Sequence, residues 1–599
     1  MASNYLDISQ ILPMLDDSED EDRTVDMSDD GNESDLDRDI VIPGGGGESA
    51  SEEESSSEDE DAAAEDAEDA GGDAPAPNAR QRRPRRPRPA AWPTPNWSDQ
   101  IHDFADLEDF RGSPGINPNL ECLLDSKTTP YEYFQLFVPE TFYDDMAEQT
   151  NLYAAYDKKC PKSWEPVDVA AIKQYLYVNF MFGIHNLNDY KNYWSEDELL
   201  KVSAISSVMP RRRYEQINRF FHLNDNNAPR AKLKKGEEGF DPLYKVRPLM
   251  DLVRNGCINN FYPGCEVAID EAMISFTGRL FFKQYMKGKP IPWGIKVWCC
   301  ADSKTGYIFY FRVYTGKFEQ ASDDGQGFDV VMEMGRLLLD KWHHFYFDNF
   351  FTSVKLAEKL LSRNTYMCGT IRTNRKGWPK DLRAKKKKKD DPAVKYRQSG
   401  NLLATQWFDK RVVNVLSSNS QPRMTETMRN TAEGRVPKEI PVPIKTYNSF
   451  MGGVDLHDQY RSYYSIGRRT VKWWRNLVWF LFQVSILNAY QLYKAYYMRS
   501  VSTIKMLSHF EFRLEIIRSL RQTSSRKRCR EVPTPSPRTI EKCTSIRMLG
   551  NKKRCHQCKK HGRKTASQRL PETVYGCNKC FVHICQGDCF HEHLQEQYK

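Results

Sequence analysis

The spacing of apolar residues changes twice along this chain, and these two changes restrict its fold more than any other feature. Between about residues 126 and 262, apolar side chains recur at helical intervals. One such stripe consists of Val246, Leu249, Met250 and Val253. From Cys265 the alternation is that of strands, and after Gly453 helical spacing returns. A chain of 599 residues exceeds what a single core holds, so we expect several domains. The two changes in spacing predict that an α/β domain lies between two helical segments.

The middle segment has the element order of a mixed sheet. Residues 265–276 alternate in polarity, and two β-rich runs within residues 294–316 are joined by the turn sequence DSKTG. Helical and strand patterns then follow in turn up to residue 379. This order predicts a mixed α/β sheet. Residues 377–445 look irregular, and we expect an insertion there that carries the basic loop AKKKKKDD.

The charge of the chain is very unevenly distributed. Residues 1–79 contain 27 Asp or Glu and two Arg, a net charge of −25, although the whole chain is formally +6. The remainder therefore carries +31, which favours nucleic acid as a partner over ordinary solvated surface charge. The acidic segment has little to bury, so we expect disorder from residue 1 to about 125. Within this stretch, RQRRPRRPRP fits a minor-groove arm, a basic linker or a nuclear import signal.

Three aspartates lie where carboxylates are unusual. Asp270 and Asp348 are each surrounded by apolar residues in separate expected strands, and Asp455 follows Gly452 and Gly453 before a strongly apolar helix. A buried carboxylate needs either a Lys or Arg partner or a divalent cation shared with other carboxylates, and both possibilities stay open here. Oxygen ligands favour Mg²⁺ or Mn²⁺, and two such ions catalyse phosphodiester transfer. The glycine pair would form the tight turn that brings Asp455 over the sheet.

The end of the chain is a separate cysteine-rich module. Two C-x-x-C pairs, CHQC and CNKC, are followed by HICQGDCFHEH. Thiolates at this spacing fit adjacent corners of a tetrahedron, so we expect structural Zn²⁺ rather than free thiols, and two interleaved ions. The candidate ligands are Cys555, Cys558, Cys577, Cys580, Cys585, Cys589, His583, His591 and His593. The module also resembles a RING or PHD finger, so a ubiquitin ligase or histone-tail reader is a rival interpretation.

Five features, in order along the chain, resemble the piggyBac transposase family. They are IDEAMISFTGR, YFDNFFTS, GTIRTNR, FMGGVDLHDQY and the terminal cysteine cluster. The resemblance covers about residues 125–599 and implies an RNase H-like catalytic core inserted in a helical dimerisation and DNA-binding domain. It also implies a metal-dependent enzyme that excises a DNA transposon through hairpin intermediates and integrates it at TTAA sites.

The resemblance assigns roles to four aspartates. Matching motif to motif, it makes Asp270, Asp348 and Asp455 the catalytic ligands of Mg²⁺ or Mn²⁺. Asp458 matches a further aspartate with a supporting catalytic role. The zinc module would read sequences at the transposon end.

The same comparison of motifs assigns DNA contacts. Arg372 corresponds to a basic residue near the active-site DNA, and Lys289 and Lys296 could bind backbone phosphates. Trp473 corresponds to an aromatic that stacks on DNA near the cut. The alternative for Trp473 and its neighbour Trp474 is core packing, and we expect at least one of them to have that role.

Pattern and resemblance together predict a multidomain α/β protein. The expected segments are a disordered acidic tail with a basic arm (1–125), the first helical part (126–262), the first part of the catalytic core (263–376), an insertion (377–445), the end of the core (446–456), the second helical part (457–520), a basic linker (521–553) and the zinc module (554–599).

The expected setting is the nucleus, with double-stranded DNA as the partner and a homodimer as the active form. We expect no membrane span, because no apolar run approaches about 18 residues, and the acidic N-terminus does not resemble a signal peptide. Two rivals remain. One is a domesticated descendant that binds DNA or chromatin without transposition, and the other is a non-enzymatic zinc-finger adaptor.

Overall fold

The structure, a computed structural model, describes most of the chain between residues 92 and 521 and parts of the C-terminal module. The described residues are 92–102, 106–286, 291–316, 322–384, 386–387, 391–431, 434–468, 470–499, 505–521, 545–547, 553–565, 567, 569–577, 583–585, 588–589 and 592–593. The acidic segment 1–79 and most of the linker 521–553 lie outside them, so the predictions made there stay predictions.

Order begins earlier than the sequence indicated. The indole N–H of Trp92 donates to the Glu358 carboxylate at 2.8 Å, and that of Trp97 donates to the Gly377 carbonyl at 2.7 Å. The expectation of disorder up to residue 125 is therefore wrong for the described residues from 92 onward. Two tryptophans anchor a segment that has little regular structure, because their apolar rings and N–H groups both find partners in the body of the protein.

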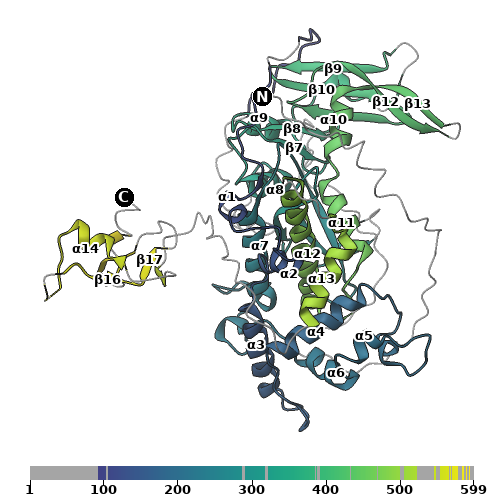
Figure 1. Cartoon of the computed structure of the whole chain (residues 1–599). Helices are drawn as coiled ribbons and strands as arrows, with labels where there is room; N and C mark the ends of the chain where they lie inside the picture. Colours follow the sequence, from purple (N-terminus) through teal and green to yellow (C-terminus); the bar gives the residue numbers. More distant parts are fainter. Residues whose placement is uncertain are drawn as a thin grey trace, which may run out of the picture. The chain divides into compact units, whose positions relative to one another are not determined.

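Helices are the main regular elements of the described chain before residue 261 and between residues 442 and 521 (Figure 1). They are α1 (Pro118–Glu121), α2 (Pro130–Gln135), α3 (Phe142–Tyr156), α4 (Val169–Phe182), α5 (Ser203–Ser206), α6 (Arg211–Phe220), α7 (Arg247–Asn260), α8 (Gln326–Gly335), α9 (Val354–Leu361), α10 (Val442–Phe450), α11 (Gly453–Tyr463), α12 (Trp473–Arg499), α13 (His509–Arg521) and α14 (His556–Lys560). Short 3-10 helices are η3 (Tyr190–Trp194), η4 (Pro229–Lys232), η5 (Tyr244–Val246) and η6 (Lys380–Leu382).

The strands lie mainly between these two helical regions. They are β1 (Gly115–Ile116), β2 (Phe261–Tyr262), β3 (Glu266–Ser275), β4 (Gln284–Tyr285), β5 (Trp293–Asp302), β6 (Ile308–Val313), β7 (His344–Phe347), β8 (Tyr366–Thr370), β9 (Val394–Ser399), β10 (Leu402–Phe408), β11 (Val412–Ser417), β12 (Met424–Thr431), β13 (Gly434–Pro441), β14 (Ser545–Arg547), β15 (Lys553–Arg554), β16 (Glu572–Thr573) and β17 (Tyr575–Cys577).

The two helical regions pack together although about 200 residues separate them. Tyr133 of α2 contacts Tyr493 of α12, with ring centroids 5.8 Å apart, and Phe134 lies 6.4 Å from Phe482. The stripe predicted around α7 is buried, which confirms that it faces the core. Local signals fix the helix starts, as in α2, where Thr129 and Glu132 form a capping box.

A nine-stranded mixed sheet forms the centre of the α/β region. Its order is β4-β5-β3-β7-β8-β11-β10-β9, with β6 also paired to β5. β3, β5 and β6 are antiparallel neighbours, whereas β3, β7 and β8 run parallel. This arrangement confirms the mixed sheet that the alternating strand and helix patterns predicted.

The segment expected to be irregular is in fact built from strands. β9, β10 and β11 extend the central sheet, and β12 and β13 form a separate hairpin. The sequence signal was weak because polar residues occupy buried positions, where the structure supplies partners that the sequence does not show. Gln406, for example, is buried in β10 and donates to the Leu382 carbonyl at 2.6 Å.

Helices cover both faces of the sheet. Val267 and Ile269 of β3 share a core with α8 and α9, whereas Ala272 and Ile274 share a core with α12 on the opposite face. The helices α11, α12 and α13 lie next to one another (Figure 1). Because α12 packs against both the sheet and the helices α2 and α7, it is apolar on nearly all sides. Within the described chain, no helix combines the length and apolar content needed for a membrane span.

Candidate active site and cysteine cluster

Asp270 and Asp348 come together because β3 and β7 are neighbouring parallel strands. The register pairs Ala268 with Tyr346, and two residues later the chains reach Asp270 and Asp348. Side chains two residues apart in a strand share a face, so both carboxylates lie at one level of the sheet. Asp348 directly follows β7 and accepts the Phe350 N–H at 2.9 Å, which turns the chain away from the strand.

Asp455 is held above the same face of the sheet by α11. Gly453, the first residue of that helix, packs directly on β3, because a Cβ built there would lie 3.1 Å from the Ala268 Cβ. Ala268 is two residues before Asp270 and shares its face. One turn further, His457 donates from Nδ1 to the Gly306 carbonyl at 3.0 Å and fixes the helix. Asp455 itself is exposed, in the first turn, where the helix dipole favours a negative charge.

The glycine pair does not act as the predicted tight turn. Gly452 has φ −85° and ψ 13°, values open to any residue, and Gly453 is already helical. The requirement at Gly453 is space, because its missing side chain lets α11 approach β3. For Gly452 the structure gives no reason.

Tyr447 is a residue of this region that the sequence analysis did not single out. It lies in α10, is 8 % exposed, and packs with Tyr346 and Cys368. Burial raises the pKa of Tyr447 to about 12; a hydrogen bond with Thr370 opposes the rise, and the charges of Asp348 and then Asp270 add to it. The Tyr447 hydroxyl is therefore close enough to both strand aspartates for their charges to raise its pKa. A sequence signal existed, because Tyr447 lies three residues after the buried Ile444, on the buried side of a helix.

The oxygen donors of the three aspartates suit Mg²⁺ or Mn²⁺ chemically. Within the described residues, no three acidic side chains have ligand oxygens all within 4.8 Å of one another. A single ion therefore does not have three of these carboxylates around it in this geometry. Two ions about 3.5–4 Å apart would be held by carboxylates that are spread more widely than this limit.

Asp458 lies one turn after Asp455 and is engaged by an arginine. Arg461 Nη2 donates to the Asp458 carboxylate at 3.0 Å and to the Met273 carbonyl of β3 at 3.4 Å. The pair therefore ties α11 to the strand that carries Asp270. This position suits a supporting role.

Of the predicted basic DNA ligands, Arg372 is near the aspartates and Lys296 is not. Arg372, exposed just after β8, donates from Nε to the side chain of Asn349, the residue after Asp348, at 3.0 Å. Lys296 is 8 % exposed, lies 3.8 Å from the Glu271 carboxylate, and stacks over the Trp298 ring. Trp298 belongs to the core on the α8 side, so the structure places Lys296 on the opposite face of the sheet from Asp270. This geometry does not support a phosphate contact for Lys296.

The tryptophan pair divides as the sequence analysis allowed. Trp474 is 1 % exposed and stacks near Phe221, which is core packing. Trp473, at the start of α12, is half-buried and meets Phe282 edge-on with centroids 5.4 Å apart. Its DNA contact stays a prediction. Lys289 lies outside the described residues.

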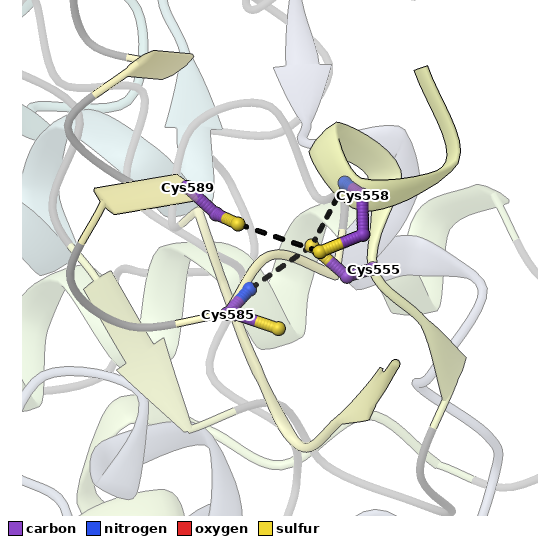
Figure 2. A group of neighbouring side chains, drawn as sticks. All are labelled: Cys555, Cys558, Cys585 and Cys589. Carbon is purple, nitrogen blue, oxygen red and sulfur yellow. Dashed lines mark hydrogen bonds between the residues drawn. The ribbon is translucent and has the colours of Figure 1, made fainter. Parts of the chain in front are cut away.

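In the C-terminal module four cysteines converge, as Figure 2 shows. The sulfur atoms of Cys555, Cys558, Cys585 and Cys589 all lie within 4.8 Å of one another. A tetrahedral Zn²⁺ with Zn–S bonds of about 2.3 Å needs sulfurs about 3.8 Å apart, so the set fits this ion. The N–H groups of Cys558 and Cys585 donate to the Cys555 sulfur at 3.5 and 3.3 Å. Burial raises the Cys555 pKa, but these bonds outweigh it and lower that pKa, which favours the thiolate that binds metal.

Among the described residues, the other predicted zinc ligands are not part of this group. Cys577 is buried in the same cluster as Cys555, Cys558 and Cys589, but its sulfur is not one of the four. His593 is buried and His583 is half-buried. Cys580 and His591 lie outside the described residues. Among the described residues, Cys555 and Cys558 of the first C-x-x-C pair thus meet Cys585 and Cys589 rather than Cys577, and a second, interleaved site stays a prediction.

Comparison with known proteins follows the same segments. Residues 129–490 match a family model described as Transposase IS4. PiggyBac transposable element-derived protein 3 of Homo sapiens is 28 % identical over 472 residues, covering 76 % of this chain and 74 % of that protein. The chain belongs to the piggyBac transposase family. PiggyBac transposable element-derived protein 2 of Homo sapiens is 27 % identical over 410 residues, covering 64 % of this chain and 65 % of that protein.

The piggyBac fold extends to a solved structure. The cryo-EM structure of a piggyBac transposase synaptic complex with hairpin DNA superposes with a TM-score of 0.60 at 21 % identity, covering 79 % of this chain and 99 % of that one. The Transposase IS4 match begins at the N-cap of α2 and ends within α12. It therefore includes the four aspartates, whereas the cysteine cluster lies beyond it.

Proposed function

We propose that this protein is a cut-and-paste DNA transposase that excises transposon ends through hairpin intermediates and integrates them at TTAA sites. One observation carries the proposal. The register of β3 and β7 brings Asp270 level with Asp348, and the contact of Gly453 with Ala268 holds α11 above that face. Carboxylates gathered from two strands and a helix, with a family match over residues 129–490, support a nuclease site better than salt bridges do.

In this proposal the sheet order β6-β5-β3-β7-β8 is that of an RNase H-like core. Asp270, Asp348 and Asp455 would hold Mg²⁺ or Mn²⁺. When bound, a pair of these ions activates a water or a 3′-hydroxyl and stabilises the leaving oxygen. The protein's own contribution is position, because the two strands fix Asp270 and Asp348 and α11 sets the height of Asp455. Arg372 is close enough to Asp348 to bind a phosphate of the DNA beside the cut.

The remaining assignments complete the proposal. The four-cysteine group would bind one structural Zn²⁺ and the second set of ligands another, and the folded module would read the transposon ends. The helical region would support a homodimer, and the basic body would act on DNA in the nucleus. That a solved neighbour of the same fold is named as a synaptic complex with hairpin DNA supports DNA as the partner.

A second candidate is a transposase-derived protein that binds DNA or chromatin and no longer moves it. The names of the human relatives, which describe them as transposable element-derived, favour this candidate. The four unsubstituted aspartates favour the enzyme instead.

The deciding assay is cleavage of a labelled transposon-end duplex, with the end sequence taken from TTAA-bounded inverted repeats flanking the gene. With Mg²⁺ or Mn²⁺ the wild type should cleave, and Asp455→Asn should lose at least about 100-fold of the rate. Binding measured in Ca²⁺ should be unchanged, since phosphate contacts come mainly from Lys and Arg. Asp144→Asn is the matched control, because Asp144 is also exposed in the first turn of a helix, α3.

Two results would count against the enzyme. Binding by the wild type without cleavage supports the transposase-derived binder. Cleavage by Asp455→Asn at the wild-type rate removes Asp455 from the site.

A further inference from the structure

Three large aromatic side chains are exposed next to the catalytic sheet. Phe281 is 55 % exposed, Tyr285 is 55 % exposed and Trp293 is 45 % exposed. They lie on β4, at the start of β5, and in the segment before β4. Three exposed aromatic rings so close together along the chain are unusual on a protein surface and indicate a site of interaction. We call these three residues the aromatic platform.

The platform is held rigidly. Tyr285 and Trp293 are directly opposite each other in the antiparallel β4–β5 pair, and their ring centroids are 4.8 Å apart. Phe276 donates its N–H to the Trp293 carbonyl at 3.3 Å. At Gly294 the strands β5 and β3 approach so closely that a Cβ there would lie 2.2 Å from the Ile274 carbonyl oxygen. Tyr285 and Trp293 therefore lie on paired strands, and ordering these two rings for a ligand costs little entropy.

Positive charge accompanies the rings. The Lys283 ammonium lies 4.8 Å from the centre of the Trp293 ring, and the Lys235 ammonium lies 5.3 Å from that of Phe281. In the described part of the chain, neither lysine is paired with a carboxylate. The sequence adds Lys287 and Lys289 between Tyr285 and Trp293. Flat exposed rings with unneutralised lysines are complementary to a ligand with aromatic faces and negative charges.

Unpaired DNA has both properties. In a duplex the base faces are covered by stacking, whereas unpaired bases stack on protein aromatics while lysines bind their phosphates. A contact between copies of the protein would also cover the rings, but Lys235 and Lys283 on each side would repel one another.

The position of the platform suits DNA held at the active site. Gly294 is paired with Ser275, five residues along β3 from Asp270, which is about 17 Å at about 3.4 Å per residue. The Phe281 ring contacts Phe282, with ring centroids 5.0 Å apart, and Phe282 contacts Trp473, with centroids 5.4 Å apart. Trp473 is the residue already expected to stack on DNA.

We propose that Tyr285 and Trp293 form a stacking site for unpaired bases of single-stranded DNA, with Lys283 and Lys235 binding the adjacent phosphates. The proposal deepens the transposase function on which it rests, because hairpin ends and opened target sites present unpaired bases.

The test is equilibrium binding of full-length protein to a labelled 12-nucleotide oligothymidine and to a duplex of the same length, in Ca²⁺. Trp293→Ala and Tyr285→Ala should each weaken binding to oligothymidine about tenfold, the lower part of the range for one stacked base, and change duplex binding less than twofold. Trp293→Phe should retain most of the affinity because a ring remains. Tyr156→Ala is the matched control, since Tyr156 is an exposed aromatic, 52 %, at the end of α3.

Equal affinity of wild type, Trp293→Ala and Tyr285→Ala for oligothymidine overturns the proposal. So does a loss of dimer in sedimentation with unchanged DNA affinity, which would make the platform a contact between copies. The outcome is separate from that of the cleavage assay. If the wild type cleaves and Trp293→Ala binds oligothymidine as tightly as the wild type, only the stacking proposal is refuted. If Trp293→Ala binds oligothymidine more weakly and the wild type does not cleave, the stacking proposal stands and the transposase function is refuted.

Discussion

Gly453 offers the sharpest test of how the fold positions the candidate active site. Replacing it with alanine adds one methyl group at the contact between α11 and β3. That Cβ would lie 3.0 Å from the Asp302 carbonyl oxygen, 3.0 Å from the Ser303 Cα and 3.1 Å from the Ala268 Cβ. All three neighbours are backbone atoms or a Cβ, so none can turn aside as a long side chain would. The helix itself must move away from the strand.

The size of the effect follows from these distances. Ordinary contact begins near 3.4 Å, so α11 must shift by a few tenths of an ångström. Overpacking of this kind costs about 1–3 kcal/mol, and replacing glycine by alanine in a helix returns about 0.5–1 kcal/mol. The free energy of unfolding should therefore fall by no more than about 2.5 kcal/mol. Catalysis should fall further, because a displacement of 1 Å can cost about 100-fold in rate. For Gly453→Ala we expect a loss of about tenfold.

Gly452→Ala is the matched control. It adds the same methyl group one residue earlier, where nothing lies within 4 Å and φ is ordinary. Cleavage of the transposon-end duplex should be near the wild-type rate in Gly452→Ala and about tenfold slower in Gly453→Ala, with equal DNA binding in Ca²⁺. Urea denaturation separates the catalytic loss from a loss of folded protein. If both variants cleaved alike, the packing of α11 on β3 would not position Asp455.

Three further predictions use other parts of the structure. Tyr447→Phe should lower the rate of cleavage more than it lowers DNA affinity, because the charges of both strand aspartates act on the Tyr447 hydroxyl. The loss of its hydrogen bond with Thr370 should lower the free energy of unfolding by about 1 kcal/mol. A normal rate of cleavage would make Tyr447 purely structural. Elemental analysis should find about one zinc fewer per chain in Cys585→Ser, which changes the four-cysteine group, and likewise in Cys577→Ser, which would change the proposed second site. An unchanged zinc content in Cys585→Ser would exclude the four-cysteine site. Burial lowers the pKa of His343 and of His344 to about 4, below the usual value of about 6.5. The folded protein is therefore fully stable above about pH 6.5 and loses stability as the pH falls toward 4, because the unfolded chain binds protons first. Urea denaturation between pH 7 and 4 should show the free energy of unfolding fall by up to about 3 kcal/mol per histidine, and His344→Gln should reduce that fall.

The sequence determined the secondary structure wherever one face of an element is buried. The stripe around Val253 and the alternation around Ile269 reflect that geometry directly, so both elements were predictable. The all-round apolar helix α12 was equally clear, because burial on both sides leaves no polar stripe. Local spacing also indicated a metal site at the C-x-x-C pairs, since two thiolates four residues apart or fewer can meet without help from the rest of the fold.

Tertiary structure decided which of these residues meet. Asp270 and Asp348 are 78 residues apart, and only the parallel register of β3 and β7 makes them neighbours. The choice of Cys585 and Cys589 over the nearer Cys577 as partners of the first C-x-x-C pair likewise depends on how the module folds back.

Three departures from the sequence-based expectations have the same physical origin. Gly453 is needed for close approach to β3 rather than for a turn, the strands after residue 393 are stabilised by neighbours such as Leu382, and Trp92 is ordered by Glu358. In each case a residue depends on a partner remote in sequence. Periodicity and spacing record whether a side chain is buried and which residues are near it along the chain, whereas the identity of a distant partner is set only when the sheet and helices pack.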